Sequence, residues 1–185
     1  MCIRDSCYIL DLFITTPDMP TATIPSPDLE SAIASFRTCA TVATAGDGLL
    51  LPNWADQDWK HLFRFTSIRS VMPGDALIRH GEPDQTLYFV LRGQLEVIVR
   101  SGDGLSMGQL ALVGAGSVLG EMAFFDGGPR SASAWAVDDC DIAAMTPDQH
   151  SAFEKASPAL AHELVFALGR ILATRLRRTN ARLFG

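Results

Sequence analysis

The chain has 185 residues, of which 48% are hydrophobic and 19% are charged. This composition allows one packed domain with extensions and is unlike that of a disordered chain. The formal net charge of -6 argues against a general nucleic-acid-binding surface, although an acidic protein can still hold one small anion in a local positive pocket.

Cysteine usage and hydropathy indicate a protein of a reducing compartment. The four cysteines form no Cys-x-x-Cys pair, and no histidine stands at metal-ligand spacing from them, so we read them as free thiols. The uninterrupted apolar runs are far shorter than the ~20 residues of a membrane-spanning helix. The N-terminal segment lacks the pattern of a secretion signal. We therefore expect a cytoplasmic protein.

Residues 1–28 are expected to lie outside the folded domain, as a disordered or non-native segment followed by a linker. Residues 1–14 resemble translated sequencing-adapter sequence. Residues 15–28 contain Pro17, Pro20, Pro25 and Pro27 among Thr and Ser residues, a composition typical of a linker.

Residues 29–65 are expected to form an N-terminal helical segment. Asp28 is placed to cap a first helix over Leu29–Thr38. Apolar residues at helical spacing predict a second helix over Asp56–Phe65.

Residues 66–146 show a pattern of short strands separated by turns. Apolar runs alternate with turn signals such as Pro73-Gly74-Asp75, at intervals of roughly 8–12 residues, which favours an antiparallel roll or barrel. Arg92-Gly93 between two such runs predicts a hairpin. The runs predicted as strands are Ile68–Val71, Ala76–Arg79, Leu87–Leu91, Gln94–Arg100, Leu105–Leu112, Val118–Leu119, Ala132–Ala136 and Ile142–Met145.

Residues 147–185 return to a helical period and are expected to serve as hinge and lid. Thr146-Pro147 is a favourable pair of cap and first-turn residues, and Ser157-Pro158 predicts a second helix start by the same rule. That second helix is predicted to run to about Phe184. Gly169 lowers its helix propensity by ~1 kcal/mol relative to Ala and permits close approach of another element. Its apolar face, typical of a core or dimer seam, consists of Leu164, Leu168, Ile171, Leu172, Leu176 and Leu183.

The most informative stretch is Gly120–Ser133, which reads Gly-Glu-Met-Ala-Phe-Phe-Asp-Gly-Gly-Pro-Arg-Ser-Ala-Ser. It places a carboxylate, Glu121, and a guanidinium, Arg130, around a Gly-Gly-Pro turn and among apolar residues. Buried polar groups of this kind must be satisfied within a pocket or they cost stability. Arg offers a planar fork of donors to a phosphate and Glu offers acceptors to a hydroxyl, so the two suit a small anion that carries a sugar hydroxyl. The alternative is a structural salt bridge between them.

This stretch resembles the phosphate-binding cassette of cyclic nucleotide-binding domains, whose form is Gly-Glu, an apolar run, then Pro-Arg, any residue, Ala and Ser or Thr. Leu119 and Phe124-Phe125 depart from the usual residues but remain apolar. The resemblance covers about Trp59–Leu183 and includes Pro73-Gly74-Asp75, Ile78, Gly81, Leu87–Val90 and Gly93. It implies an α+β, mainly β fold: an eight-stranded antiparallel β-roll of the double-stranded β-helix or jelly-roll type, with N-terminal helices and a long C-terminal helix.

The resemblance also implies a role for each cassette residue. Arg130 would pair with the cyclic phosphate, and Glu121 would accept a hydrogen bond from the ribose 2′-hydroxyl. Gly120 would let the backbone approach the sugar. Backbone N–H groups at the start of a short helix would complete the phosphate site. The remaining ligand-binding positions of the cassette are Met122, Ala123, Ser131, Ala132 and Ser133.

The C-terminal helix is expected to cover the base of the ligand. Arg175-Leu176, followed by Thr179 and Asn180, is similar to the long helix of the bacterial catabolite activator proteins, where small polar residues at these positions meet the adenine amino group. This match favours cAMP over cGMP, whereas Ser131 fits either nucleotide. The alternative for Thr179 and Asn180 is a solvated helix face. No metal and no cofactor besides the nucleotide ligand is expected.

The leading hypothesis is therefore a regulatory module that binds a cyclic nucleotide and moves its C-terminal helix. Catalysis is not expected, because the histidines lack acid or nucleophile partners. The expected partners are a second copy through the C-terminal helix and a membrane transporter or other effector domain; binding of nucleic acid by this chain alone is not expected. The cassette and tail are also similar to the C-terminal sensor of bacterial sulfate-permease-type transporters. The alternatives are a non-binding structural or interaction domain of the same fold, and a fragment of a transporter sensor or of a transcription regulator.

Overall fold

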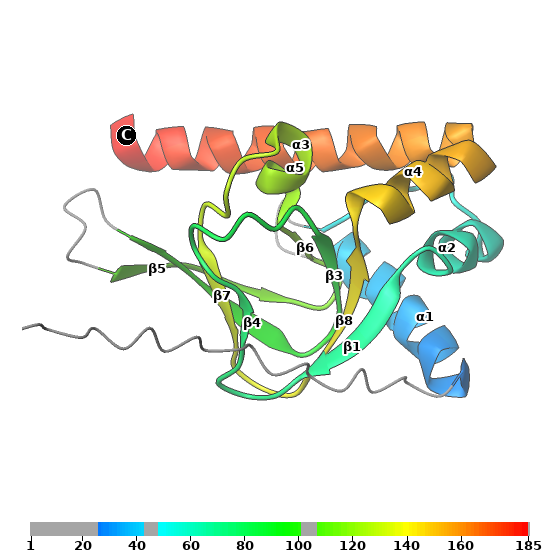
Figure 1. Ribbon diagram of the computed structural model, residues 1–185, viewed down its shortest axis with the longest axis horizontal. Coiled ribbons are helices and arrows are strands. Elements are labelled where there is room, and N and C mark those ends of the chain that lie inside the picture. Colours follow the sequence, from blue (N-terminus) through cyan, green and yellow to red (C-terminus); the bar gives the residue numbers. More distant parts are fainter. Residues whose placement is uncertain (1–25, 43–47, 101–106, 185) are drawn as a thin grey trace, which may run out of the picture.

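The computed structural model describes residues 26–42, 48–100 and 107–184 (Figure 1). The predictions for the non-native segment and for most of the linker fall on residues 1–25 and lie outside the described residues. The described part of the chain forms two antiparallel sheets and a set of helices around them.

The roll consists of two four-stranded sheets, which confirms the predicted fold class. The first sheet has the strand order β1-β8-β3-β6, and the second has the order β2-β7-β4-β5. All of the strand pairs are antiparallel. The strands are β1 (Ser67–Val71), β2 (Ala76–Ile78), β3 (Leu87–Arg92), β4 (Gln94–Arg100), β5 (Met107–Gly114), β6 (Val118–Leu119), β7 (Ser133–Ala136) and β8 (Cys140–Met145).

The turn at Arg92-Gly93 is not a hairpin, so that prediction is wrong. β3 pairs with β6 and β8, whereas β4 pairs with β5 and β7, and the chain therefore passes from one sheet to the other at Gly93. Gly93 has a φ of 85°, and a Cβ on it would lie 2.6 Å from the Asp139 carbonyl oxygen and from Cys140 Sγ. A glycine at a turn reports the backbone conformation that is needed there. It does not report which strand the next segment pairs with.

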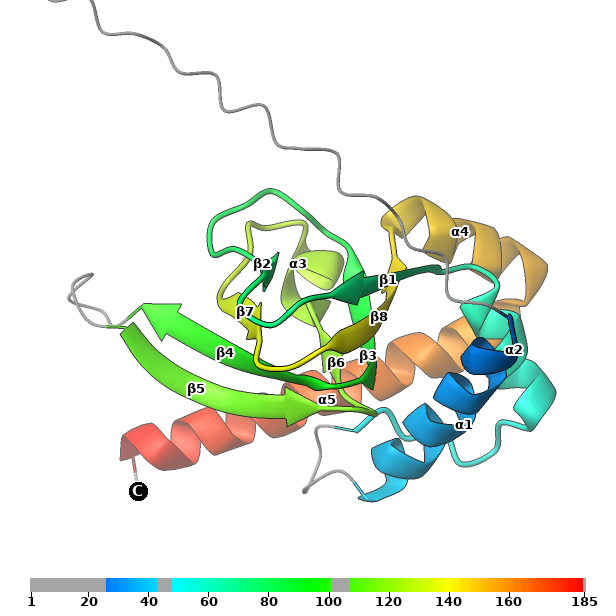
Figure 2. The ribbon, with the colours of Figure 1, turned by 90° about the horizontal axis from the view of Figure 1, so that it is seen from below.

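α1, α2 and α4 gather at one end of the roll, α3 lies against the roll away from that end, and α5 runs along the length of the roll (Figures 1 and 2). α1 begins at Ser26, so Asp28 lies inside the helix and not at the predicted N-cap position. The predicted start after Thr146 is confirmed, because Thr146 Oγ1 accepts from Gln149 N at 3.2 Å and Thr146 N donates to Gln149 Oε1 at 2.8 Å. The helices are α1 (Ser26–Val42), α2 (Asp56–Phe63), α3 (Glu121–Asp126), α4 (Pro147–Ala156) and α5 (Pro158–Phe184).

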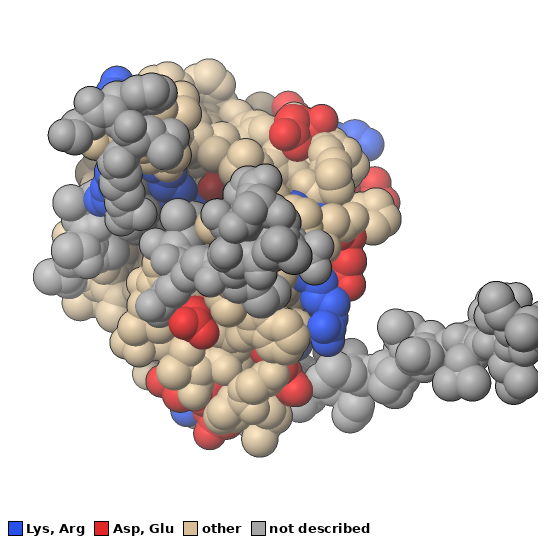
Figure 3. Space-filling view, turned by 90° about the vertical axis from the view of Figure 1, so that its left-hand side faces the viewer, with Lys and Arg blue, Asp and Glu red and all other residues tan. Residues whose placement is uncertain are grey.

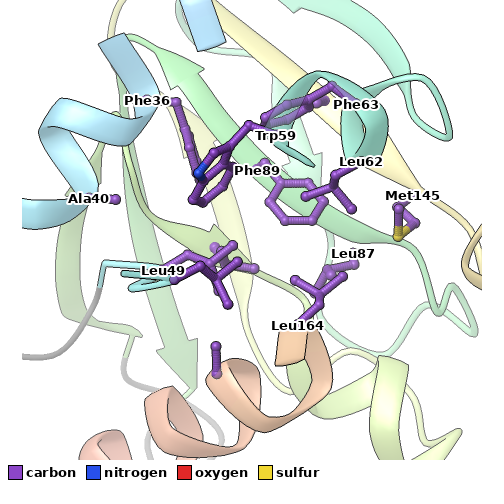
Figure 4. Close-up of a cluster of buried hydrophobic side chains, with 14 of the residues drawn as sticks. Phe36, Ala40, Leu49, Trp59, Leu62, Phe63, Leu87, Phe89, Met145 and Leu164 are labelled. Atoms are coloured by element: carbon purple, nitrogen blue, oxygen red, sulfur yellow. The ribbon is translucent and has the colours of Figure 1, made fainter. Parts of the chain in front are cut away.

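An aromatic core joins the helices to the first sheet (Figure 4). Phe36 of α1 meets Trp59 and Phe63 of α2 and Phe89 of β3 edge-on, with ring centroids 5.7–6.1 Å apart. Leu164 of α5 is fully buried in the same cluster. Each fully buried side chain of this kind contributes about 1.5–3 kcal/mol relative to an exposed one. A second core, which includes Val90, fills the space between the two sheets.

α5 is anchored to this core only over its first half. Trp54 Nε1 donates to Glu163 Oε2 at 2.9 Å, and Ile171 is the last buried residue of the helix. From Leu172 to Ala181 the side chains are half-buried or exposed. None of the helices in the described ranges combines the length and apolar character needed to cross a bilayer. The second half of α5 is thus the part of the helix that faces the roll without being buried in it.

Candidate ligand-binding site

A cavity of about 550 Å³ lies between the second sheet, α3 and the second half of α5. Its floor includes Ala134, Val97 and Ala111, which are register partners on β7, β4 and β5. Small side chains on the inner face of a sheet leave a void where larger ones would fill it. The cavity is further lined by Gly120, Glu121, Met122, Ala123, Arg130, Ser131, Ala132, Ser133, Leu172, Ala173, Arg175, Leu176, Arg178 and Thr179.

α3 begins after Gly120, whose φ of 82° is in the left-handed region. A Cβ at this position would lie 2.4 Å from Arg130 Nη1 and 2.7 Å from the Thr86 carbonyl oxygen. The left-handed backbone and the guanidinium packed against it thus both require a glycine at this position. The helix's first hydrogen bond is donated by Phe124 N to Gly120 O at 3.1 Å. The N–H groups of the residues between them have no acceptor within the helix.

Arg130 lies under the start of α3 and is 2% exposed. Its Nη1 donates to Gly120 O at 3.1 Å, and its Nη2 donates to Thr86 O at 2.6 Å and to Asp84 Oδ2 at 2.5 Å. Its Cζ lies 5.3 Å from the ring centroid of Tyr88. Its Nε is buried and has no hydrogen-bond partner among the described residues. The guanidinium is thus held on several sides and retains one unsatisfied buried donor.

Asp84 is the counter-charge of Arg130. Partial burial of this carboxyl tends to raise its pKa, but hydrogen bonds from Thr86, Arg130 and Tyr88 outweigh burial and lower the pKa from 3.8 to about 2. Thr86 N and Oγ1 donate to Oδ1 at 3.0 and 2.6 Å, and Tyr88 Oη donates to Oδ2 at 2.9 Å. Both carboxylate oxygens are therefore fixed in place at neutral pH.

Glu121 is 5% exposed and pairs with a residue of α5. Arg175 Nη1 donates to Glu121 Oε1 at 2.6 Å, and Arg175 Nη2 donates to the Val118 carbonyl oxygen at 2.9 Å. The alternative of a salt bridge between Glu121 and Arg130 is not realised, because each of the two has a different ionic partner. Arg175 thereby links the second half of α5 to the roll beside the cavity.

The other predicted site residues differ in how close they lie to the cavity. Ser131 Oγ donates to Met122 Sδ at 3.2 Å, and Ser133 Oγ accepts from His80 N at 3.0 Å. Thr179 lines the cavity, but its hydroxyl donates to the Arg175 carbonyl oxygen at 3.0 Å. Asn180 is exposed and is not among the lining residues.

Sequence reasoning missed the residues that hold the cassette's charges. Asp84 and Thr86 stand in the turn before β3, where a carboxylate followed by a hydroxyl reads as ordinary turn chemistry. In the sequence, Tyr88 is only part of a strand pattern. Arg175 stands before Leu176, and the sequence does not indicate its partner. The available signal was the presence of both charges among apolar residues, because a buried Glu and a buried Arg that do not pair each require an opposite charge elsewhere.

The roll, the short helix at its edge and the charged cavity define the class of ligand-binding β-roll domains. Residues 68–156 match the family model described as "Cyclic nucleotide-binding domain". The CRP-like cAMP-activated global transcriptional regulator of Mycobacterium tuberculosis is 32% identical over 107 residues, which are 58% of this chain and 46% of that protein. The cyclic AMP receptor protein of Thermus thermophilus is 36% identical over 110 residues, 60% of this chain and 49% of that protein.

Solved structures give the same picture. The N-terminal domain of a transcriptional regulator from Streptomyces coelicolor is 31% identical, with a TM-score of 0.56, over 70% of this chain and 89% of that one. The chain spans about half the length of the curated relatives that it matches. The chain therefore contains a cyclic nucleotide-binding domain and belongs with CRP-like homologues.

Proposed function

We propose that this chain is a regulatory module that binds a cyclic nucleotide in the cavity beside α3, cAMP in preference to cGMP, without catalysis of its own. The observation that carries the proposal is the state of Arg130, a cavity-lining guanidinium that is 2% exposed and keeps a buried N–H group without an acceptor. A buried unpaired donor costs about 1–3 kcal/mol. A buried cation that keeps an unsatisfied donor at a cavity wall is suited to an anionic ligand.

In this proposal, different cassette residues contact different parts of the ligand. Arg130 pairs with the cyclic phosphate, and Glu121 accepts a hydrogen bond from the ribose 2′-hydroxyl. The wall and the backbone N–H groups come from Gly120, Met122, Ala123, Ser131, Ala132 and Ser133. Support comes from the burial of both charged side chains at one cavity and from the free N–H groups at the start of α3.

The ion pair between Glu121 and Arg175 suggests how ligand binding changes the position of α5. The Glu121 carboxylate is occupied by Arg175 in this structure. A ribose hydroxyl that binds Glu121 competes with Arg175, so the ligand has a different affinity for the docked and the released positions of α5. A ligand shifts a conformational equilibrium only through such a difference.

We assign the base to the second half of α5 and infer a homodimer through the same helix. Phe166, Gly169, Ala173 and Leu176 are exposed and recur at intervals of three and four residues, and Asn180 continues the stripe. Thr179 is placed at the cavity of its own chain. Asn180 lies on the exposed stripe, where it suits a cavity of the second copy.

We assign the response to ligand binding to an effector domain, which belongs either to a transcription regulator or to a membrane transporter. The CRP-like relatives favour a transcription regulator. The face at the C-terminal end of α5 shows Lys and Arg interspersed with Asp and Glu (Figure 3). Mixed charge of this kind, with a net charge of -6, suits a protein partner better than nucleic acid.

Calorimetric titration with cAMP and cGMP tests the proposal. At about 0.3–0.4 kcal/mol per heavy atom over about 22 atoms, we expect a micromolar Kd. Arg130→Ala should weaken binding by about 2–5 kcal/mol, because the phosphate then lacks its countercharge. Arg64→Ala, at an exposed position outside the cavity, is the matched control and should bind as the wild type does. A folded protein that binds neither nucleotide would contradict the proposal and favour the alternative of a non-binding interaction domain.

A further inference from the structure

A second cavity, of about 500 Å³, lies between α1, the segment 49–54 and α5, and we call it the α1–α5 groove. It is nearly as large as the cavity beside α3, and the two cavities have no lining residue in common. The proposed function leaves the groove without a role. Its lining residues are Ala34, Arg37, Thr38, Thr41, Leu49, Leu50, Leu51, Pro52, Trp54, Trp59 and Arg170.

The apolar part of the groove is the outer edge of the aromatic core. Leu49, Trp54 and Trp59 belong to that core, and Leu50 is an exposed apolar side chain beside them. The one polar atom of the Trp54 ring, Nε1, donates to Glu163 Oε2 at 2.9 Å, so the ring offers carbon atoms to an occupant. This surface favours a ligand with an apolar body, because covering it removes apolar area from water.

The threonine hydroxyls of the groove are already used as donors. Thr38 Oγ1 donates to the Ala34 carbonyl oxygen at 3.0 Å, and Thr41 Oγ1 donates to the Thr38 carbonyl oxygen at 2.7 Å. A hydroxyl has a single O–H, so each threonine can only accept a hydrogen bond from a ligand. The side-chain donors that remain for an occupant are therefore those of Arg37 and Arg170.

Both arginines can turn to a ligand. Arg37 pairs with Asp56, whose side chain is 77% exposed, and ion pairs in contact with water contribute little, so a ligand carboxylate can replace or join Asp56. The side chain of Arg170 makes no hydrogen bond or ion pair with the residues that the structure describes. None of the described residues that line the groove is Asp or Glu. The groove is thus locally positive in a chain of net charge -6, which favours an anionic group there.

We propose that the α1–α5 groove is a second ligand site, which binds a small apolar carboxylate. The carboxylate group lies between Arg37 and Arg170, and the apolar body lies on the edge of the aromatic core. Because α1 and α5 each supply one arginine, the ligand joins these two helices at a place separate from the cavity beside α3. The inference goes beyond the proposed function and does not depend on it.

Naphthalene-2-carboxylate is the probe, and naphthalene-2-methanol is its uncharged counterpart. The indole N–H signals in NMR spectra of the isotope-labelled chain report where each probe binds, since Trp54 and Trp59 line the groove and Trp135 lies on β7. We expect the carboxylate to shift the signals of Trp54 and Trp59 with a Kd of about 0.1–1 mM, the scale for a ligand of about 13 heavy atoms. It should bind at least about tenfold more tightly than the alcohol, the scale of one charge-assisted hydrogen bond.

Arginine variants test the source of this preference. Arg37→Gln/Arg170→Gln should bind the two probes with Kd values within about threefold of each other, because only the carboxylate loses a partner. Arg170→Gln alone, at an exposed position, should lower the preference in part and remains informative if the double variant does not fold. Arg177→Gln is the matched control, since Arg177 is an exposed arginine of α5 that does not line the groove, and it should keep the wild-type preference.

The outcomes separate this site from the cavity beside α3. Equal affinity of the wild type for the two probes, or an unchanged preference in the folded double variant, overturns the inference. It is also overturned if millimolar carboxylate shifts no indole signal, or shifts only that of Trp135, or if cAMP displaces the probe. Calorimetry with cAMP decides the proposed function by itself, so either proposal can fail while the other stands.

Discussion

At the scale of single residues, the cavity is organised by two ionic pairs that each cross between distant parts of the chain. Arg130 reaches back to Asp84 in the turn before β3, and Glu121 reaches forward to Arg175 on α5. Arg130 and Glu121 are the buried members, whereas Asp84 and Arg175 are partly exposed, so removing either partner leaves a buried charge uncompensated. Removal of Asp84 or Arg175 should therefore destabilise the fold as well as disturb the proposed site.

The lowered pKa of Asp84 predicts an acid-dependent part of the stability. The carboxyl has a pKa of about 2 in the folded protein, against 3.8 for an unperturbed side chain. Between these values the unfolded chain binds more protons, so the contribution is fully present above about pH 4 and is lost as the pH falls through about 2. Asp84→Asn should lack this dependence. Urea unfolding midpoints measured from pH 4 downward should fall less steeply in the variant. Equal slopes in the two proteins would show that folding does not lower the pKa of Asp84.

The cassette's charged residues could be recognised from sequence, but their partners could not. Glu121 and Arg130 stand within one short motif whose glycines and proline fix the local path of the chain. Asp84 and Arg175 lie 46 and 54 positions away from the residues that they bind. Such contacts depend on how the sheets close, and a local pattern does not encode that closure.

At the scale of elements, α5 has two halves with different surroundings. Its first half is buried in the aromatic core and tied through Glu163 to Trp54. Its second half borders the cavity and is linked to the roll by Arg175. In the proposed function, movement of the second half alone would leave the first half packed in the core.

Substitution of Gly169 separates the stability of α5 from its association. A Cβ built on this glycine meets no atom within 4 Å, so Gly169→Ala should raise the free energy of unfolding by about 1 kcal/mol through helix propensity. The added methyl group should weaken self-association, because it keeps the two α5 helices of the proposed dimer farther apart at this position. Chemical unfolding at low protein concentration and sedimentation of the native protein measure the two effects. The reverse change at the same stripe, Ala173→Gly, is the control and should lower stability by a similar amount. Association that is unchanged in Gly169→Ala would place the dimer contact elsewhere.

The elements themselves were largely predictable, and their pairing was not. Proline after a capping residue located the starts of α4 and α5, because these signals act within one helical turn. The Arg92-Gly93 turn was placed correctly but given the wrong consequence, since β3 and β4 belong to different sheets. Local sequence determines where a strand ends. The strand that pairs with it depends on contacts with segments far along the chain, here β8 for β3 and β7 for β4.

At the scale of the whole molecule, the two cores and the cavity share the same strands. β3 contributes Phe89 to the aromatic core and Val90 to the core between the sheets. The strand thus couples the helical end of the molecule to the roll. A change at one core is expected to affect the stability of the entire described fold.

Ligand binding should therefore stabilise the molecule as a unit. A ligand present at 100 times its Kd adds about 2.7 kcal/mol to the stability of the native state. For a chain of this size each kcal/mol corresponds to about 2–4 °C, so cAMP should raise the Tm by roughly 5–10 °C. Arg130→Ala at the same cAMP concentration should show a much smaller shift, and Arg64→Ala should match the wild type. An equal shift in all three proteins would indicate binding outside the cavity.

The positions of the three tryptophans give the molecule two built-in optical reporters. Trp54 and Trp59 pack against each other with ring centroids 5.2 Å apart, beside the anchored half of α5. Trp135 lies on β7 next to the cavity-floor residue Ala134, with the Arg79 guanidinium 5.2 Å from its ring centroid. Intrinsic fluorescence of Trp54→Phe/Trp59→Phe follows the roll alone, and that of Trp135→Phe follows the aromatic core beside the anchored half of α5. Events beside the cavity and in the aromatic core can thus be timed separately without attaching a dye.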